Sequence, residues 1–198
     1  MIGILGRLDY TPSGKEAYIV YKDLNDIVLK YDMNVIGIMP NEIEKTKELI
    51  NMCDGVILSG GSNISKNDFA IIKYIYDNNI PCLGICMGMQ EMAYLFGGVM
   101  KDIDNHYNKN HKVIISNSNI YGDKVMDVNS RHKSYIAQTD LEVVGRSEDG
   151  IIEMVEDKFK KFFVGVEWHP ENMYDSVDAK ILFDKFIDST KDIKKEIK

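Results

Sequence analysis

The sequence of 198 residues is long enough for one domain with a sizeable hydrophobic core. Hydrophobic residues make up 44% of the chain and charged residues 28%, which is ordinary for a soluble globular protein. The formal net charge of −7 argues against nucleic-acid binding, and no run approaches the roughly 20 apolar residues that a membrane span needs.

The chain opens with a short apolar run, residues 1–6, that no basic segment precedes. This run predicts a first buried strand rather than a signal peptide. Three cysteines, Cys53, Cys82 and Cys86, show neither a disulfide framework nor a metal-binding spacing. We therefore expect a reducing, cytoplasmic location. No cofactor is implied and no cluster of metal ligands is visible, so no metal site is expected.

The first half of the chain alternates short apolar runs with segments of helical periodicity. This alternation predicts βαβ units, and therefore a parallel sheet with helices on both faces. Strands are expected at residues 2–5, 35–39, 55–58 and 80–85, and helices at about 14–31, 42–51, 67–78 and 87–96.

The second half predicts antiparallel strands that extend or flank this sheet, with a hairpin turn at Asp149-Gly150. A polar loop is expected at 106–111, a helix that packs on the sheet at 176–188, and a frayed helix end in the lysine-rich tail, 191–198. No repeat or linker is visible, so we expect a single domain over residues 1–198. The strands are expected at 112–116, 142–146, 151–156 and 162–166.

The segment Gly84-Ile85-Cys86-Met87-Gly88 has the pattern G-x-C-x-G where a strand meets a helix. It is the cysteine counterpart of the serine nucleophile elbow, in which glycines allow close packing around a strained nucleophile. The helix N-terminus favours a thiolate and offers N–H groups to an oxyanion. Alone, the pattern is only suggestive, because a cysteine after a strand is more often a core residue. Cys53 and Cys82 are interpreted as core residues.

The segment Trp168-His169-Pro170-Glu171 follows the last predicted strand. A general base must lie near the sulfur and needs a partner that fixes its tautomer. The two-residue spacing of His169 and Glu171 places both side chains on the same side of an extended chain. Cys86, His169 and Glu171 are therefore the candidate nucleophile, base and orienting carboxylate. The other histidines, His106, His111 and His132, have no carboxylate two residues later.

The segment Leu58-Ser59-Gly60-Gly61 ends the third predicted strand. It would lie at the carboxyl edge of the sheet, where open α/β sheets bind ligands. The two glycines would let a backbone N–H approach an oxyanion. A plain tight turn is the alternative, and no phosphate-loop pattern follows.

Together, these segments resemble the class I glutamine amidotransferase superfamily, and within it the γ-glutamyl hydrolase (peptidase C26-like) branch. The elbow and the W-H-P-E segment are typical of the superfamily, whereas residues 128–132 and 149–153 favour the hydrolase branch. The resemblance implies a flavodoxin-like three-layer α/β sandwich, whose mostly parallel central sheet is extended by antiparallel strands.

The same resemblance implies hydrolysis of a γ-glutamyl amide through a glutamyl thioester, with Cys86, His169 and Glu171 as the catalytic triad. It implies that the backbones of Gly61 and Met87 form the oxyanion hole. The residues implied in substrate binding are Gly60, Gln90, Asn129, Ser130, Arg131 and His132.

The sequence departs from the family pattern at two positions, and both departures bear on which leaving group the enzyme would release. Met89 stands where many amidotransferases have histidine, and Met87 stands where γ-aminobutyrate-conjugate hydrolases often have arginine. A narrower resemblance is to the γ-glutamyl-CDP-amidate hydrolases of capsule phosphoramidate biosynthesis. It implies that Arg131 and Arg7 contact a diphosphate. A surface ion pair is the alternative for both arginines, and is favoured for Arg7.

Three other functions stay open. The chain could be a γ-glutamyl-γ-aminobutyrate-type hydrolase, a glutaminase subunit that passes ammonia to a partner synthetase, or a sensor in which Cys86 is only oxidised. The complete triad weighs against the sensor. For the enzyme we expect a small-molecule γ-glutamyl conjugate as the ligand, and neither nucleic acid nor a membrane. The sequence does not determine the oligomeric state.

Overall fold

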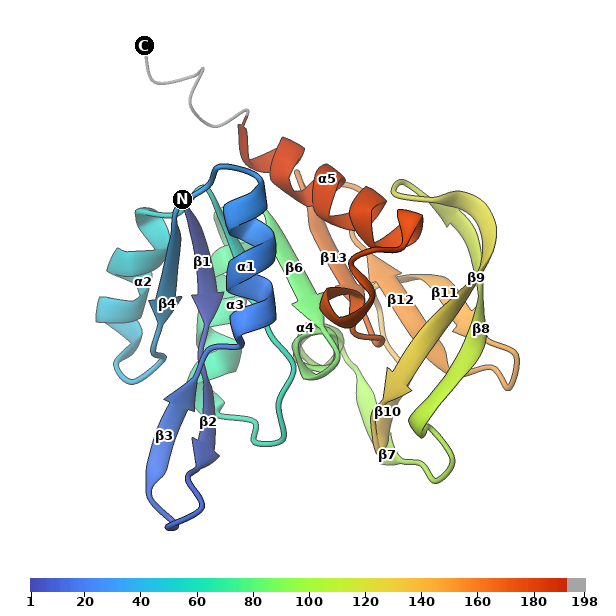
Figure 1. The fold of residues 1–198 in the computed structure, drawn as a ribbon, viewed down its shortest axis with the longest axis horizontal. Helices are drawn as coiled ribbons and strands as arrows, with labels where there is room; N and C mark the ends of the chain where they lie inside the picture. The colour runs from blue at the N-terminus through green and yellow to red at the C-terminus, as the bar shows by residue number, and fades with distance from the viewer. Residues whose placement is uncertain (192–198) are drawn as a thin grey trace.

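The computed structural model describes residues 1–191. Its centre is a nine-stranded sheet in the order β4-β1-β5-β6-β13-β12-β11-β8-β9 (Figure 1). Neighbours from β4 to β13 are parallel, and those from β13 to β9 are antiparallel. The strands of this sheet are β1 (Ile2–Leu5), β4 (Val35–Ile38), β5 (Gly55–Leu58), β6 (Cys82–Ile85), β8 (Tyr107–Ser118), β9 (Gly122–Arg131), β11 (Glu142–Ser147), β12 (Ile152–Glu156) and β13 (Phe163–Val166).

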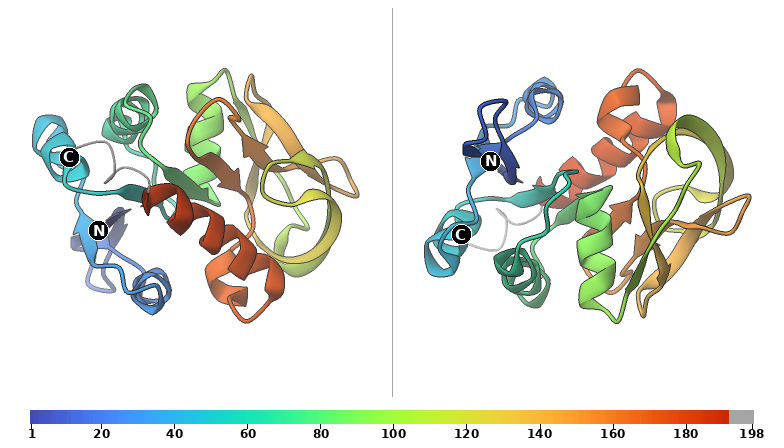
Figure 2. Two further views of the ribbon diagram at one scale, coloured as in Figure 1. Left: turned by 90° about the horizontal axis from the view of Figure 1, so that it is seen from above. Right: turned by 90° about the horizontal axis from the view of Figure 1, so that it is seen from below.

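Helices cover both faces of the parallel part of the sheet (Figure 2). Helices α1 and α5 pack on the face that includes Ile4 and Ile57, and helices α2, α3 and α4 pack on the face of Leu5 and Val56. Strands covered on both faces are apolar throughout, which is why β1, β5, β6 and β13 are fully buried. The structure is thus a three-layer α/β sandwich extended by antiparallel strands, as expected. The helices are α1 (Lys22–Lys30), α2 (Ile43–Asn51), α3 (Lys66–Asp77), α4 (Met87–Leu95) and α5 (Val177–Lys191), with a 3-10 turn η1 (Pro170–Met173).

The helix expected at 14–31 is wrong in its first half. Strands β2 (Arg7–Tyr10) and β3 (Glu16–Ile19) form an antiparallel hairpin, and α1 begins only at Lys22. Gly14 closes the hairpin turn with φ +77°, a conformation that favours glycine. The hairpin projects beyond the carboxyl edge of the sheet (Figure 1).

The second half contains strands that the sequence did not indicate. β7 (Val99–Asp102) pairs with β10 (Ser134–Gln138) in a separate two-stranded sheet, and β9 pairs with β8 at the edge of the large sheet. The polar loop expected at 106–111 is wrong, because β8 begins at Tyr107. The turn at Asp149-Gly150 is confirmed, with the Gly150 N–H donating to the Ser147 carbonyl at 2.9 Å. Beyond Lys191, the expected frayed end lies outside the described residues.

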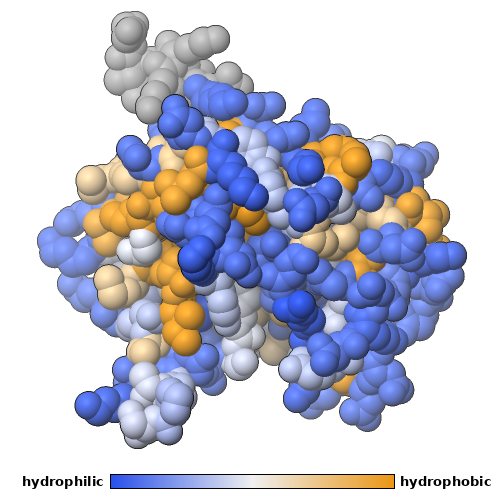
Figure 3. Space-filling view, in the orientation of Figure 1, coloured by the Kyte–Doolittle hydropathy of each residue, from blue (hydrophilic) through white to orange (hydrophobic). Residues whose placement is uncertain are grey.

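The carboxyl ends of β1, β5, β6 and β13 meet at one edge of the sheet, the lower edge in Figure 1. The space-filling view shows this edge hollowed between the β2–β3 hairpin and the region of β7 and β8 (Figure 3). Among the helices of residues 1–191, none combines the length and apolar character that a membrane crossing requires.

Candidate active site

Cys86 lies at the tight turn between β6 and α4, with φ +51° and ψ −110°. A residue with a side chain rarely adopts this conformation, and such strain is concentrated at functional sites. The Cys86 N–H donates to the Val166 carbonyl at 2.8 Å, which ties the end of β6 to the end of β13. A methyl group on Gly88 would lie 2.2 Å from the Leu58 carbonyl oxygen, so this packing requires glycine. The strained turn predicted from the sequence is therefore present.

His169 and Glu171 follow β13, the parallel neighbour of β6. His169 Nδ1 lies 2.6 Å from Glu171 Oε1. Because the carboxylate can only accept, Nδ1 carries the hydrogen and Nε2 is left to exchange a proton. A methyl group on Gly60 would lie 2.8 Å from His169 Cε1 and 3.6 Å from Cys86 Cβ. The His169 ring and the Cys86 side chain therefore both lie next to Gly60.

The surroundings of Cys86 disfavour the thiolate in the free protein. Burial raises its pKa well above the ordinary value, and the negative charge of Glu167 raises it further. The Met87 N–H donates to the sulfur and lowers the pKa, as expected for a helix N-terminus, but the effect of burial is larger. Deprotonation of Cys86 would therefore need a base such as His169.

The two expected oxyanion donors, Gly61 and Met87, lie side by side. A methyl group on Gly61 would lie 2.8 Å from Met87 Cε, so the loop after β5 packs directly on the start of α4. Both residues line the same hollow as Cys86. The Met87 N–H donates to the sulfur, and Gly61 borders the same hollow, so the assignment of the Gly61 N–H to the oxyanion hole stays a prediction.

Arg7 is 2% exposed and supports this loop from inside the protein. Its Nε donates to the Ser59 carbonyl at 2.8 Å, and its Nη1 donates to Glu91 Oε1 at 3.0 Å. Its Nη2 lies 2.8 Å from Glu91 Oε2, and Asp68 lies 3.4 Å from Nη1. Both sequence interpretations of Arg7, a diphosphate contact and a surface ion pair, are therefore wrong. Arg7 is the first residue of β2 and follows closely on β1, and from this position its side chain lies beneath the loop and forms a buried ion pair.

Cys86 lies between two hollows of about 340 and about 360 Å³, each large enough for part of a small molecule. Gly61, Ser62, Cys86, Tyr107 and Arg131 line both of them. The first hollow is completed by Ile64, Met87, Gln90, Met100, His132, Lys133 and Ser134. The second is completed by Tyr21, Asp23, Gly60, His169, Glu171 and Asn172.

Four of the residues expected to bind substrate line these hollows: Gly60, Gln90, Arg131 and His132. The amide nitrogen of Gln90 already donates to the Ser134 carbonyl at 2.9 Å and to Glu167. Arg131 is exposed and donates from Nη1 to Asn172. The Arg131 side chain therefore remains open to a ligand.

Asn129 and Ser130 are not among the residues that line the hollows. The Asn129 amide donates to the His169 carbonyl at 2.8 Å, and the His169 N–H donates to Asn129 Oδ1 at 2.8 Å. Ser130 is buried and donates to the His106 carbonyl. The structure therefore gives Asn129 a positioning contact with His169, which nothing in the sequence indicated.

Sequence reasoning also missed residues that come from separate segments. Tyr21 and Tyr107 border the hollows but belong to no recognisable motif. His106, His111 and Glu153 gather behind His132, although no ligand spacing links them in the sequence. They meet because β8, β9 and β12 belong to one sheet, in which β11 lies between β12 and β8.

Comparisons with known proteins show the family to which the chain belongs. The family model of class-I glutamine amidotransferases matches residues 21–189. A Schizosaccharomyces pombe protein described as a glutamine amidotransferase is 30% identical over 179 residues, which cover 70% of each chain. The GMP synthase of Enterococcus faecalis is 34% identical over 128 residues, which cover 59% of this chain and only 24% of the synthase.

A solved structure from Thermoplasma acidophilum, described as one subunit of a GMP synthase, superposes with a TM-score of 0.78 at 19% identity. The match covers 98% of this chain and 96% of that one, and it shows a common fold. Since the family model matches most of the chain and the relatives agree with it, this protein belongs to the class-I glutamine amidotransferase family.

Proposed function

We propose that this protein is a cysteine-dependent hydrolase that cleaves a γ-glutamyl amide bond and releases glutamate. The observation that carries the proposal is the strained Cys86 turn beside the His169–Glu171 pair, with both side chains bordering Gly60. Family membership supports the reaction class. We expect the enzyme to act in the cytoplasm, where Cys86 would stay reduced.

In the proposed reaction, His169 Nε2 takes the thiol proton as the Cys86 sulfur attacks the γ-carbonyl carbon. The N–H groups of Gly61 and Met87 stabilise the oxyanion. The C–N bond then breaks, and His169 returns the proton to the departing amine. Water attacks the glutamyl thioester with His169 again acting as base, which frees glutamate and the thiol.

The two hollows suit the two parts of such a substrate. The hollow lined by Gln90 and His132 lies on the Met87 side of Cys86 and would take the glutamyl group. The hollow lined by Tyr21 and Asn172 lies on the His169 side, where a departing amine would collect its proton.

Our first candidate substrate is the γ-glutamyl conjugate of CDP-amidate, whose hydrolysis gives CDP-amidate and glutamate for capsule decoration. Arg131 lines both hollows and Lys133 lines one, so two cations are available to a diphosphate. The Lys133 Nζ lies over the Tyr107 ring, 4.6 Å from its centroid, so a base would stack on the other face of this ring. Arg7 cannot contribute, because its guanidinium is buried against Glu91.

A second candidate function is that of a glutaminase subunit that supplies ammonia to a partner synthetase. The observation that favours it is the match over 98% of this chain to the structure described as one subunit of a GMP synthase. Hydrolysis of free glutamine that rises sharply when a synthetase is added would support this candidate.

The first test is glutamate release from a panel of glutamine, γ-glutamyl-γ-aminobutyrate and the CDP-linked glutamine conjugate. Release from one conjugate that the Cys86→Ser variant abolishes would establish the hydrolase and its leaving group. No release from any member, while Cys86 still reacts with an alkylating agent, would contradict the stand-alone hydrolase.

Arg131→Ala tests the nucleotide substrate separately. We expect it to raise KM for the CDP-linked conjugate far more than KM for glutamine. Equal kinetics of both proteins on the nucleotide conjugate would remove Arg131 from diphosphate binding.

A further inference from the structure

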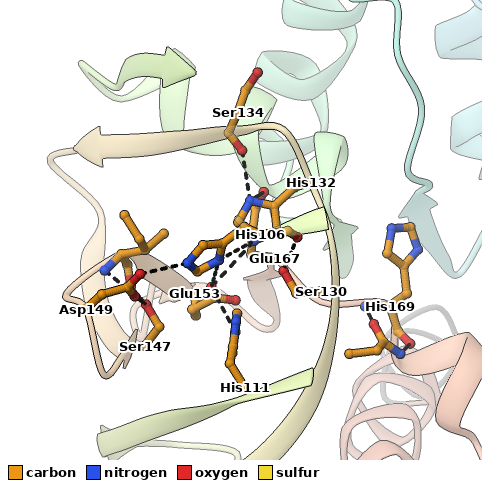
Figure 4. Close-up of polar contacts among 12 residues, drawn as sticks. His106, His111, Ser130, His132, Ser134, Ser147, Asp149, Glu153, Glu167 and His169 are labelled. Carbon is orange, nitrogen blue, oxygen red and sulfur yellow. Dashed lines mark hydrogen bonds and ion pairs between the residues drawn. The ribbon is translucent and has the colours of Figure 1, made fainter. Parts of the chain in front are cut away.

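Three histidines and a glutamate gather behind the wall of the cleft (Figure 4). His106 precedes β8, His111 lies in β8, His132 follows β9 and Glu153 lies in β12. His106, His132 and Glu153 are almost fully buried, and their donor atoms all lie within 4.8 Å of one another. His169 lies apart from this group (Figure 4). The cluster is therefore separate from the proposed catalytic residues, although His132 also lines the cleft.

The outer contacts of His106 and His132 fix which nitrogen of each ring carries hydrogen. His106 Nε2 lies 2.8 Å from Asp149 Oδ2, and a carboxylate accepts. His132 Nδ1 lies 3.0 Å from the Ser134 carbonyl, which also accepts. Each neutral ring therefore turns a lone pair inward, from Nδ1 of His106 and from Nε2 of His132. This is the arrangement of metal-bound histidines, whose other nitrogen donates to a carboxylate or a carbonyl.

The three inward atoms form an almost regular triangle. His106 Nδ1 lies 3.3 Å from His132 Nε2 and 3.8 Å from Glu153 Oε1, and His132 Nε2 lies 3.6 Å from the same oxygen. Donors of a tetrahedral zinc ion, each about 2.0–2.2 Å from the metal, lie about 3.3–3.6 Å apart. The triangle therefore fits one small cation without rearrangement of the rings.

The charges around the triangle also call for a cation. Glu153 is completely buried, and neither of its oxygens makes a hydrogen bond within residues 1–191. In the described part of the chain, the ion-pair partners of this carboxylate within 4.0 Å are histidine rings alone. Buried carboxylates without a charged partner are costly unless they bind a cation.

We infer that His106, His132 and Glu153 form a binding site for a divalent transition-metal ion, with zinc as the first candidate. Two imidazoles and one carboxylate are a ligand set of zinc sites that leave a fourth position for water. Asp149 and the Ser134 carbonyl orient the two rings. The ion would join the end of β9 and the start of β12 to the start of β8, and so hold His132 in the cleft wall. His111 Nε2 lies 3.1 Å from the carboxylate, and the His111 ring packs against that of His106 with centroids 4.9 Å apart, but His111 is not one of the three donors.

The test is a titration of chelator-stripped protein with Zn²⁺ and with Co²⁺. The Cys86→Ser variant is titrated alongside the wild type, because Cys86 and His169 offer an unrelated sulfur–nitrogen pair to either ion. We expect one equivalent of metal per chain in both proteins, retained through gel filtration. The Co²⁺ form of Cys86→Ser should show visible bands without a sulfur-to-cobalt charge-transfer band. Zinc at about 100-fold above Kd should raise the unfolding midpoint by about 5–10 °C.

Variants made in the Cys86→Ser protein then locate the ion. His132→Gln and Glu153→Gln should abolish stoichiometric binding, and Asp149→Asn should weaken it about 10- to 100-fold. His111→Gln is the matched control, since it removes a neighbouring histidine outside the triangle and should keep one equivalent.

Failure of the wild-type protein to bind either ion stoichiometrically would overturn the inference, and the triangle would then hold a shared proton. Binding that survives in both His132→Gln and Glu153→Gln would overturn it as well. Should these variants not fold, X-ray absorption of the Co²⁺ form of Cys86→Ser decides the matter. Two imidazole ligands are expected, and a spectrum without imidazole would refute the site. None of these measurements uses turnover, so they are independent of the proposed reaction.

Discussion

Asn129 holds the main chain of His169 through two hydrogen bonds of 2.8 Å, donating to its carbonyl and accepting from its N–H. The imidazole of His169 is fixed separately by Glu171. The backbone of the proposed base is thus held by Asn129 of β9, and its ring by Glu171 of η1. The position of His169 therefore depends on the antiparallel half of the sheet as well as on its own strand.

Asn129→Ala should lower kcat for glutamate release with little change in KM. Each lost hydrogen bond contributes about 0.5–1.5 kcal/mol, which corresponds to a fall of about 5- to 160-fold if both act in the transition state. Asn129→Asp keeps the acceptor for the His169 N–H and should be intermediate. A raised KM with an unchanged kcat would instead place Asn129 on the substrate.

Gly60→Ala should abolish activity while the protein still folds. The added methyl group would lie 2.8 Å from His169 Cε1, so the imidazole must move away from Cys86. Gly14→Ala is the control, because its methyl group meets no atom within 4 Å and its φ of +77° affects only the exposed hairpin. Wild-type kcat in Gly60→Ala would show that the ring tolerates the shift.

At pH 9, Arg7→Met should lower the free energy of unfolding by about 3–5 kcal/mol, because burial raises the pKa of Glu91 to about 8 and the carboxylate, charged at this pH, loses its cationic partner. The double variant Arg7→Met/Glu91→Gln should recover part of this loss, since the charge is then removed. Urea unfolding of the three proteins measures the difference. A single variant as stable as the wild type would show that Glu91 is already neutral in the folded protein.

Alkylation of Cys86 by iodoacetamide should accelerate with pH through 9 and beyond in the free protein. Burial raises the pKa of this thiol, so the reactive thiolate is scarce at neutral pH and increases as the pH approaches the raised value. Mass spectrometry of the modified peptides separates it from Cys53, whose pKa burial raises to about 11. A rate that levels off below pH 8 would contradict the raised pKa.

The parallel half of the fold could be predicted from the sequence because its strands and its helices are each marked by a pattern within a short segment. Apolar runs such as residues 55–58 belong to strands covered on both faces, and the helices between them show a clear period. The hairpin of β2 and β3 was missed because residues 16–19 lead directly into α1 and resemble its first turns. Strands β7, β9 and β10 were missed because many of their residues are exposed and lack an apolar run.

The candidate site also has parts that a short segment predicts and parts that depend on distant segments. The Cys86 turn and the His169–Glu171 pair were predictable, because each is a short segment whose geometry follows from its own residues. The buried ion pair of Arg7 and Glu91 was not, since it joins residues 84 positions apart. The histidine cluster depends likewise on the pairing of three distant segments, and no local spacing reports it.

The position of β13 has a consequence for the order in which the protein acquires its site during synthesis. This strand is followed by the last helix of the described chain, yet it fills the centre of the sheet, between β6 and β12. Until it emerges from the ribosome, β6 is an edge strand, and the thiol of Cys86 has no base beside it. Insertion of β13 closes the sheet and delivers His169 in the same step. A truncated or incompletely synthesised chain therefore has no assembled reactive centre, and the onset of activity coincides with completion of the fold.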